Sequence, residues 1–402
     1  MQNVVIEQPY EFVPPGRSEW WPRVVQLLLN RYLRKKFGVH SVQCREVERL
    51  TASLDAGHGV LLAPNHCRLS DPLTLGVLSR SIRRNMHVMT SWHLFKQDWF
   101  TTFMTRSIGA FSVYREGTDR QAINTAVGIL VAGKRPLVVF PEGAISRHND
   151  RLMPLMDGTS FIARTAAKRR EKNKAAAGVV VHPIAIRYFF TGNLEQTIMP
   201  VIHEIESHFS WYPQRDRTLI QRLQQIAQAL LSLKEIEYFG QARAGDFYQR
   251  VDLLIDDELT KLEKEYDVKD QGEGTVVRVK NLRTAILPDM VRGSISTEER
   301  QRRWKQLAAC YYVQQMSHYP RNYVRPSAPN MIEHILETVE RFEEDFTDRA
   351  TVHSPLHAVI EVGQVIPVSS RRDRNAADPV MEGIRAQLTE MLERLSGEAG
   401  RV

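Results

Sequence analysis

Short apolar runs alternate with amphipathic stretches over the first half of the chain. The runs have the length and composition of strands that are buried on both faces of a parallel sheet, and they fall at residues 59–63, 110–114, 137–140 and 179–186. Between two of them, residues 119–132 carry apolar side chains at helical spacing and are followed by Gly133, where a helix is expected to stop. This alternation predicts an α/β fold with a mostly parallel central sheet flanked by helices.

The N-terminal region predicts an arm followed by an amphipathic helix. Residues 1–16 end in Pro-Pro-Gly and are expected to be a loose arm, and Ser18 is expected to cap a helix that runs to Phe37. The apolar stripe of this helix consists of Trp21, Val24, Val25, Leu28, Tyr32 and Leu33. Its other flank carries Arg23, Arg31, Arg34, Lys35 and Lys36. Such a helix either lies in a membrane interface or caps a domain, and both can hold at once.

The second half of the chain has a different pattern of apolar and polar residues. Long polar-faced helices are expected at residues 214–237, 246–266, 297–316 and 331–346, with loops at 270–274 and 319–329 between them. Residues 358–368 then return to alternating strand character, and residues 378–395 are expected to close the chain as a helix.

Composition and charge narrow the class of protein. The chain has 402 residues, of which 43% are hydrophobic and 25% charged, as in an ordinary globular protein. Three cysteines without C-x-x-C spacing argue against a disulfide framework or zinc site and favour a reducing, cytoplasmic compartment. No apolar run approaches the roughly 18 residues that span a bilayer. The net charge of +7 suits an anionic surface, such as phospholipid headgroups or an acidic acyl carrier. Nucleic acid is set aside, because no motif for it accompanies the charge.

A histidine and an aspartate lie between the first buried run and the next expected helix. His66 follows the run, and Asp71 with Pro72 is expected to open the helix. Five positions apart, the two side chains would diverge within one helix, so they meet only if His66 lies in the loop. A carboxylate bound to one imidazole nitrogen leaves the other free to take a proton from a hydroxyl, which predicts a general base. The adjacent Cys67 is expected to fill space rather than act as a nucleophile.

Four blocks follow one another in a characteristic order. They are Asn65-His66-x4-Asp71, Gly109-Ala-Phe-Ser-Val-Tyr-Arg115, Phe140-Pro141-Glu142-Gly143 and Val181-His-Pro-Ile-Ala-Ile186. In order and spacing they resemble the glycerolipid acyltransferase family, that is, the bacterial lysophosphatidic acid acyltransferases and their glycerol-3-phosphate acyltransferase relatives. The resemblance covers residues 65–186. It implies an α/β fold and transfer of a fatty acyl group from a thioester to a hydroxyl.

The resemblance also implies roles for particular residues. His66 and Asp71 would be catalytic. The expected substrate-binding residues are Asn65, Gly109, Arg115, Pro141, Glu142, Gly143 and Arg147. An arginine fork suits a phosphate, a glycine lets the backbone approach a ligand, and Glu142 would hydrogen-bond the hydroxyls of the acceptor. We expect no cofactor and no metal, because the histidines show no metal-ligand spacing.

The chain departs from the family where threonine, serine or basic residues are common, at Arg68, Ala144, Ile145, Met156 and Asp157. One cation that would read a phosphate is therefore missing, and Arg147 is expected to reach into the same space. The acceptor stays open: lysophosphatidic acid, a less phosphate-dependent lysolipid, or a lipid with an amino-acid headgroup.

In the family, a strand of the type found at residues 358–368 and a final helix directly follow the fourth block. Here they come much later, which an insertion permits because loop-closure cost grows slowly with length. We therefore expect four regions: an arm and interface helix at 1–40, an acyltransferase core at 41–204, a helical insertion at 205–350, and the last strand and helix of the core at 351–402. The alternative is an independent helical domain with a chance strand.

Three functions compete on this evidence. The first is an O-acyltransferase of phospholipid or glycerolipid synthesis, which takes its acyl group from acyl-CoA or acyl carrier protein and transfers it to a lysolipid or glycerol-3-phosphate-type acceptor. It would sit peripherally on anionic lipid at the inner, cytoplasmic face of a membrane. The second is a non-catalytic lipid-binding scaffold on the same fold. The third, a hydrolase, is disfavoured because no Gly-x-Ser-x-Gly elbow is present.

Overall fold

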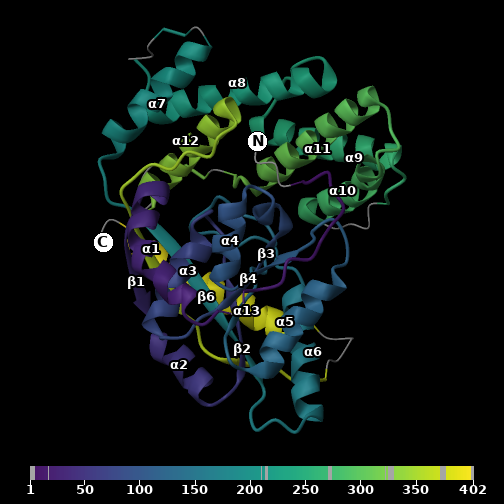
Figure 1. The fold of residues 1–402 in the computed structure, drawn as a ribbon. Helices are drawn as coiled ribbons and strands as arrows, with labels where there is room; N and C mark the ends of the chain where they lie inside the picture. The colour runs from purple at the N-terminus through teal and green to yellow at the C-terminus, as the bar shows by residue number, and fades with distance from the viewer. Residues whose placement is uncertain are drawn as a thin grey trace. The chain divides into compact units, whose positions relative to one another are not determined.

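The protein is described from a computed structural model (Figure 1). The description covers residues 5–16, 18–209, 211–212, 216–269, 274–321, 323–324, 330–371 and 377–399. The loop expected at 270–274 and the Pro-rich end of the loop at 319–329 therefore fall almost entirely outside the described residues. The chain divides into two compact units. The sheet unit comprises residues 10–192 and 354–402, and the helical unit comprises residues 1–9 and 193–353.

The sheet unit is built on one eight-stranded sheet in the order β1-β7-β6-β2-β5-β3-β4, with β8 paired to β6. The strands are β1 (Val39–Arg45), β2 (Gly59–Pro64), β3 (His87–Ser91), β4 (Ala110–Val113), β5 (Leu137–Val138), β6 (Val179–Phe190), β7 (Leu356–Val362) and β8 (Ile366–Pro367). All pairs are parallel except β6 with β7 and β6 with β8. This confirms the predicted α/β fold with a mostly parallel sheet.

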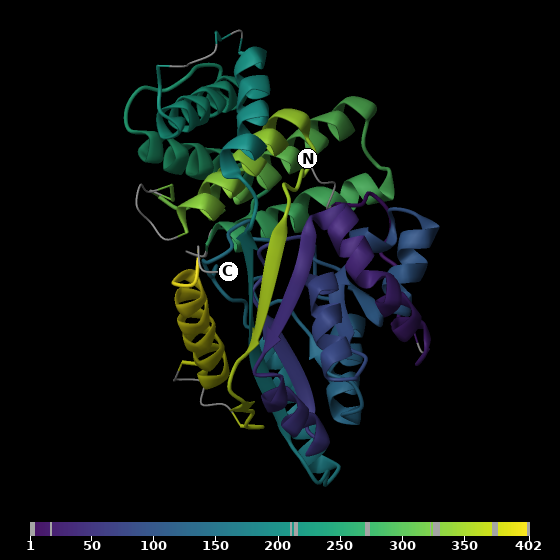
Figure 2. The same cartoon turned by 90° about the vertical axis from the view of Figure 1, so that its left-hand side faces the viewer.

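Helices cover both faces of this sheet. One face is covered by α1 (Trp21–Phe37), α2 (Val47–Asp55) and α3 (Asp71–Ser81), and the other by α5 (Arg120–Ala132), α6 (Gly158–Lys172) and α13 (Pro379–Ser396). Figure 2 shows α13, in yellow, on one side of β6 and β7. Next to β3 and β4 lie the 3-10 helix η1 (Trp92–Phe95) and α4 (Trp99–Ser107). Leu61 and Ala63 of β2 pack into the core beneath α5 and α6, while Val60 and Leu62 are buried on the opposite face. The strand is therefore buried on both faces, as expected.

The antiparallel neighbours β6 and β7 are separated in sequence by the whole helical segment. Phe190 pairs with Leu356, and the Thr191 N–H donates to the Pro355 carbonyl at 3.0 Å. The two ends of the intervening segment thus meet within hydrogen-bond distance. Residues 193–353 take the place that a hairpin loop would otherwise occupy.

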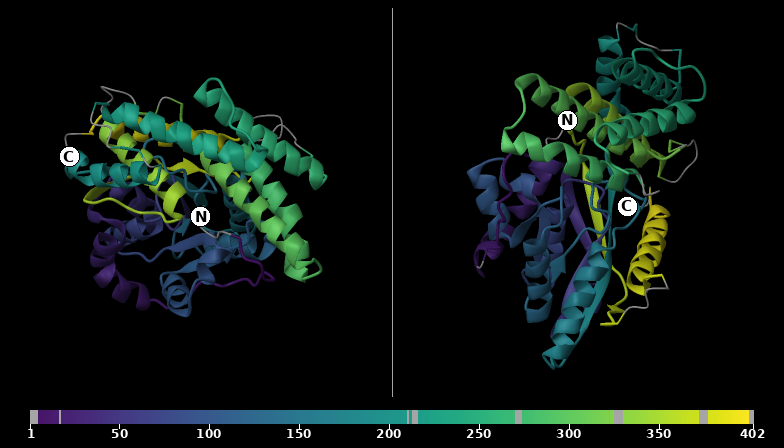
Figure 3. Two further views of the ribbon diagram at one scale, coloured as in Figure 1. Left: turned by 90° about the horizontal axis from the view of Figure 1, so that it is seen from above. Right: turned by 90° about the vertical axis from the view of Figure 1, so that its right-hand side faces the viewer.

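The helical unit contains α7 (Leu194–His208), α8 (Leu219–Phe239), α9 (Phe247–Glu265), α10 (Thr275–Arg292), α11 (Thr297–His318) and α12 (Met331–Thr347), which pack side by side (Figure 3). Bidentate arginine–glutamate pairs join successive helices, with closest N–O distances of 2.7 Å for Arg222–Glu206, 2.6 Å for Arg250–Glu235 and 2.8 Å for Arg278–Glu263. Neither α7 nor α10 was expected from the sequence. Each contains an interior proline, Pro200 or Pro288, which interrupts the local helical signal.

Residues 10–13 of the N-terminal arm bind to the sheet unit, so this part of the arm is not loose as expected. The Val13 N–H donates to Ser112 Oγ at 2.8 Å, and the Ser112 N–H donates to the Val13 carbonyl at 3.0 Å. The Tyr10 hydroxyl donates to Asp119, and its ring stacks on Tyr114. The arm thus supplies partners to β4, the edge strand, and protects that edge. A local pattern cannot reveal such a pairing.

Helix α1 presents two apolar surfaces. It begins at Trp21, whose N–H donates to Ser18 Oγ at 3.1 Å. One surface, with Leu29 and Leu33, is buried and packs on α3. The other is exposed and consists of Trp20 (60% exposed), Leu27 (81%), Leu28 (65%) and Tyr32 (45%). The expected stripe was therefore partly wrong, because Leu28 and Tyr32 lie on the exposed surface. The helix caps the sheet unit and still has an apolar surface left over.

Candidate active site

The loop between β2 and α3 brings the predicted pair together. His66 lies in this loop, and Asp71 is the first residue of α3, with Ser70 at the N-cap position. The distance from His66 Nδ1 to Asp71 Oδ2 is 2.8 Å. The Asp71 side chain is fully buried, whereas 14% of the His66 side chain is exposed. The predicted geometry, with histidine in the loop and aspartate at the helix start, is what the structure has.

Hydrogen-bond donors surround the Asp71 carboxylate. Oδ2 accepts from His66 and from the Arg68 N–H at 2.9 Å. Oδ1 accepts from the Tyr188 hydroxyl at 2.7 Å and lies 3.8 Å from Cys67 Sγ. A carboxylate that accepts from Nδ1 fixes the imidazole tautomer and leaves Nε2 as the basic atom. No group among the described residues hydrogen-bonds to Nε2, so this atom is open for a substrate hydroxyl.

The third block holds the main chain of His66 on both sides. Glu142 Oε1 accepts from the His66 N–H at 2.6 Å, and the Ser146 N–H donates to the His66 carbonyl at 2.8 Å. The ring of Phe140 stacks on the imidazole with centroids 4.0 Å apart and planes 27° apart. The loop after β5 therefore fixes both the backbone and the ring of the histidine.

Glu142 uses both of its carboxylate oxygens to hold backbone groups of the site. Its Oε2 accepts from the Met153 N–H at 2.9 Å, so both oxygens are used within the protein. The structure thus gives Glu142 a different task from the expected bond to acceptor hydroxyls. Burial raises the pKa of Glu142 to about 8, the nearby Asp71 charge adds to the rise, and the two backbone donors oppose it. A carboxyl with so perturbed a pKa is common at functional sites.

Arg115 and Gly143 meet at the same edge of the sheet. Arg115 follows β4 and donates through Nη2 to the Gly143 carbonyl. Gly143 has a φ of +68°, and a Cβ atom there would lie 2.4 Å from Met156 Sδ. The Met156 N–H also donates to the Pro141 carbonyl at 2.8 Å. Met156, one of the departures from the family, therefore packs against the Pro141–Gly143 turn.

Gly109 lies away from the pair. It precedes β4, whereas Arg115 follows it, and in a parallel sheet the two ends of a strand lie at opposite edges. Its φ is +95°, and a Cβ would lie 2.3 Å from the Met86 carbonyl oxygen. This glycine permits close backbone packing between neighbouring strands, and the structure does not bring it to His66.

Two asparagines hold the end of β6. The pairing of β2 with β6 ends at Ile184, but Asn65 donates to the Ile186 carbonyl at 3.0 Å and accepts from its N–H at 2.7 Å. Asn149 makes the same two bonds to the backbone of Tyr188, accepting from its N–H at 2.7 Å. Beyond Ile184, where β2 no longer pairs with β6, these side-chain amides make the hydrogen bonds that a neighbouring strand would otherwise make. Asn65, expected to bind substrate, uses both amide atoms on β6.

Sequence reasoning missed Tyr188 and Asn149. The fourth block was taken to end its strand at Ile186, whereas β6 continues to Phe190. The period-2 alternation of a strand would have placed Tyr188 on the same face as Ile184 and Ile186, toward α3. Nothing in the sequence marks Asn149, because this loop residue has its partner, Tyr188, 39 positions away on β6.

Three arginines come from loops at the carboxyl edge of the sheet. Arg68 follows β2, Arg115 follows β4, and Arg147 lies on the loop after β5, next to Ser146. The Arg68 guanidinium lies 5.6 Å from the centre of the Tyr188 ring. Arg147 has a φ of +64°.

Among the described residues, no cluster of three or more His, Cys, Asp or Glu side chains is arranged to hold a metal ion. No described helix is long and apolar enough to cross a membrane.

At the carboxyl edge of this mostly parallel α/β sheet, a buried aspartate thus lies behind a loop histidine. Residues 41–187 match the family described as Acyltransferase. The match covers less than half of the chain and includes all four blocks. The chain therefore carries an acyltransferase domain, consistent with the resemblance to the glycerolipid acyltransferases.

Proposed function

We propose that this protein is an O-acyltransferase that joins a fatty acyl group from an acyl thioester to a hydroxyl of a lysolipid or glycerol-3-phosphate-type acceptor, with His66 as the general base. The single observation that carries the proposal is the His66–Asp71 bond with Nε2 left open. Nε2 takes the proton of the acceptor hydroxyl, and the oxygen attacks the thioester carbonyl. A C–O bond forms, the C–S bond breaks, and the imidazolium returns the proton to the thiolate. The donor is acyl-CoA or acyl carrier protein.

An anionic acceptor suits the charge around the pair. Arg68, Arg115 and Arg147 come from three loops at the carboxyl edge, where α/β sheets bind ligands. A guanidinium is the side chain best matched to phosphate or carboxylate. Asn65, Pro141 and Gly143 would shape this site through the backbone, and no resident cofactor or metal is part of the proposal.

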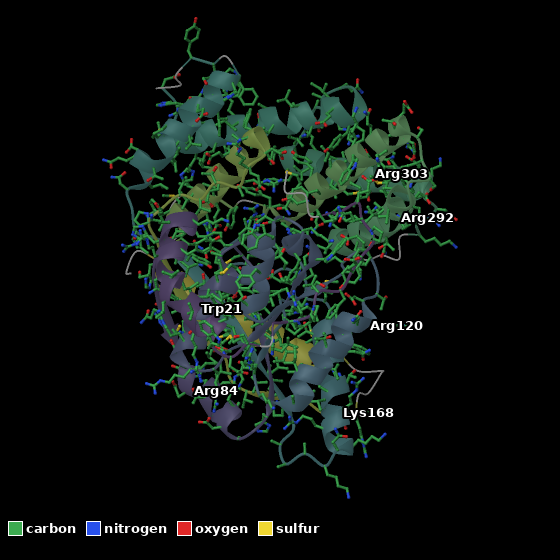
Figure 4. The ribbon with its side chains drawn as sticks, viewed as in Figure 1. Trp21, Arg84, Arg120, Lys168, Arg292 and Arg303 are labelled. Atoms are coloured by element: carbon green, nitrogen blue, oxygen red, sulfur yellow. The ribbon has the colours of Figure 1, made fainter. Side chains whose placement is uncertain are left out.

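The membrane is the second part of the proposal. The exposed surface of α1 joins tryptophan, leucine and tyrosine with the cations Arg23, Arg31, Arg34, Lys35 and Lys36, which is the composition of an interfacial helix. Trp21, labelled in Figure 4, lies edge-on against Phe103 of α4 at 5.5 Å, and Trp99 of α4 is 80% exposed. A peripheral position on anionic lipid, at the cytoplasmic face of a membrane, would deliver a lipid acceptor to the enzyme.

The test compares products directly. Purified protein is incubated with a labelled acyl thioester and, separately, lysolipids, glycerol-3-phosphate and water. We expect label in one class of acylated acceptor, and a loss of roughly 100- to 10,000-fold in His66→Ala, with only a trace left in Asp71→Asn. His40→Ala, an exposed histidine on β1, is the matched control and should keep full activity.

Three results would contradict the proposal. Near-normal transfer by His66→Ala would end the general-base assignment. Label released only to water would make the protein a hydrolase. Lipid binding without any product would favour the non-catalytic scaffold on the same fold.

A further inference from the structure

The Tyr188 hydroxyl lies directly behind the catalytic pair. It donates to Asp71 Oδ1 at 2.7 Å, on the opposite oxygen from the one that accepts from His66. We infer that Tyr188 is a positioning residue that fixes the Asp71 carboxylate for His66, an inference that rests on the proposed acyl transfer. Tyr188 lies outside all four blocks, and its side chain is fully buried, so it acts through Asp71 and not on a substrate.

The hydroxyl has a defined direction. The Ser70 hydroxyl donates to the Tyr188 oxygen at 3.0 Å, and Thr74 Oγ1 lies at the same distance. With the oxygen accepting from Ser70, the phenolic proton is directed to the carboxylate. Burial raises the pKa of Tyr188 well above its usual range, and the Asp71 charge adds to this effect. The phenol therefore keeps its proton and remains a donor.

The backbone of Tyr188 is held by residues that lie outside the helix that carries Asp71. Asn149 pairs with the N–H and carbonyl of Tyr188, and Asn65 does the same at Ile186. Tyr188 is thereby fixed to the sheet, whereas Asp71 belongs to α3. The Arg68 guanidinium lies over the ring. The hydroxyl thus ties the start of α3 to a rigid strand.

This contact matters when the proton moves. As His66 becomes an imidazolium, Asp71 has to stay in place to stabilise the new charge. Without the Tyr188 bond, Oδ1 loses its strongest donor and the carboxylate can rotate away from Nδ1. The chemical step should then slow while substrate binding is unaffected.

The first experiment uses Tyr188→Phe, which keeps the ring and removes only the hydroxyl. We expect kcat to fall roughly 10- to 100-fold, in line with a lost hydrogen bond to a charged group, and the KM for either substrate to stay within about twofold. Ser79→Ala is the matched control, because it removes a buried hydroxyl of the same helix that bonds to Arg84 and Gln26 and contacts neither Tyr188 nor Asp71. The control should keep the kcat of the unaltered protein.

The second readout needs no substrate. The proton between His66 Nδ1 and Asp71 should give a downfield NMR signal that Asp71→Asn abolishes. Tyr188→Phe should shift or broaden this signal, and Ser79→Ala should leave it in place. If Tyr188→Phe fails to fold, 3-fluorotyrosine can be placed at position 188. It keeps the hydroxyl and makes it a stronger donor, so the signal should shift from its position in the unaltered protein.

The outcomes separate this inference from the proposed function. An unchanged signal and an unchanged kcat in Tyr188→Phe would overturn the inference even in an active enzyme. A KM effect alone would also overturn it. If no acceptor is acylated by the unaltered protein but the signal responds to Tyr188, the proposed function fails and the positioning contact stands.

Discussion

Glu142 is a buried carboxyl whose pKa is raised by its environment. Its folded pKa of about 8 lies above the ordinary value of 4.5. The folded state therefore binds the proton more tightly than the unfolded state. The stabilisation from this group is fully present below about pH 4.5 and is lost as pH rises through 8.

Thermal unfolding between pH 5 and pH 9 tests this prediction. Glu142→Gln stays neutral throughout, so the stability of the unaltered protein should fall more steeply over this range than that of the variant, by up to a few kcal/mol at about 1.4 kcal/mol per pKa unit. Curves that run parallel would show that Glu142 does not titrate in this window. Glu390→Gln, at an exposed position on α13, is the control.

Arg115 gives a second prediction at this scale. If its guanidinium binds the phosphate of the acceptor, Arg115→Ala should raise the KM for a phosphorylated acceptor roughly 10- to 100-fold, as for a lost charged hydrogen bond. The KM for the thioester should change little. Arg115→Lys keeps the charge but not the fork, so it should recover only part of the loss. Steady-state kinetics with each substrate varied in turn decides, and equal effects on both KM values would move Arg115 out of the acceptor site.

The local spacing was enough to predict the contact between His66 and Asp71, but not which residues hold the two in place. The separation of His66 and Asp71, together with an expected strand and helix, required one arrangement, and the structure has it. The contacts of Glu142, Asn65 and Tyr188 depend on partners between 76 and 121 positions away in sequence. No periodicity carries such information.

At the level of elements, the exposed apolar surface of α1 predicts that this helix binds membranes. Leu27 and Leu28 are 81% and 65% exposed beside a row of cations. If this surface enters the interface, replacing both leucines by serine should weaken binding to anionic vesicles at least about tenfold, since burying a leucine contributes about 1.5–3 kcal/mol. Added salt should weaken binding further.

Vesicle co-sedimentation provides the measurement, and Leu253→Ser provides the control. Leu253 is 51% exposed on α9 and lies in the helical unit. Equal binding by the unaltered protein and the Leu27/Leu28 variant would remove α1 from the membrane contact. Loss of binding in the Leu253 variant alone would point to a different surface.

The elements that the sequence predicted well are those with a strong period. Helices α5, α9, α11 and α12 and the buried strands β2 and β6 fall close to their expected positions. The predictions failed where contacts with distant residues determine the extent or the existence of an element. β6 runs past Ile186 because β7 and two asparagines continue to pair with it, and α7 and α10 tolerate an interior proline.

For the whole molecule, the hairpin-like junction of β6 and β7 predicts that the sheet unit can dispense with the helical unit. Residues 10–192 joined to 354–402 through an Asn-Gly turn should fold, because Thr191 and Pro355 already meet. A chain that stops after residue 205 lacks β7 and α13 and should aggregate, since β6 would expose an unpaired edge. Gel filtration and cooperative thermal unfolding measure both. A soluble, active fragment of residues 1–205 would refute the prediction.

The strand order also has a consequence for how the protein is made. β1 leaves the ribosome well before its partner in the sheet, which among the described strands is β7, roughly 300 residues later. At about 5–20 residues per second, this strand waits on the order of tens of seconds for its neighbour. The helical segment, almost continuous in sequence, emerges complete before β7 does. While the helical segment is being made, the nascent chain therefore carries a sheet that still lacks β7, so the sheet unit begins before the helical segment and is completed after it.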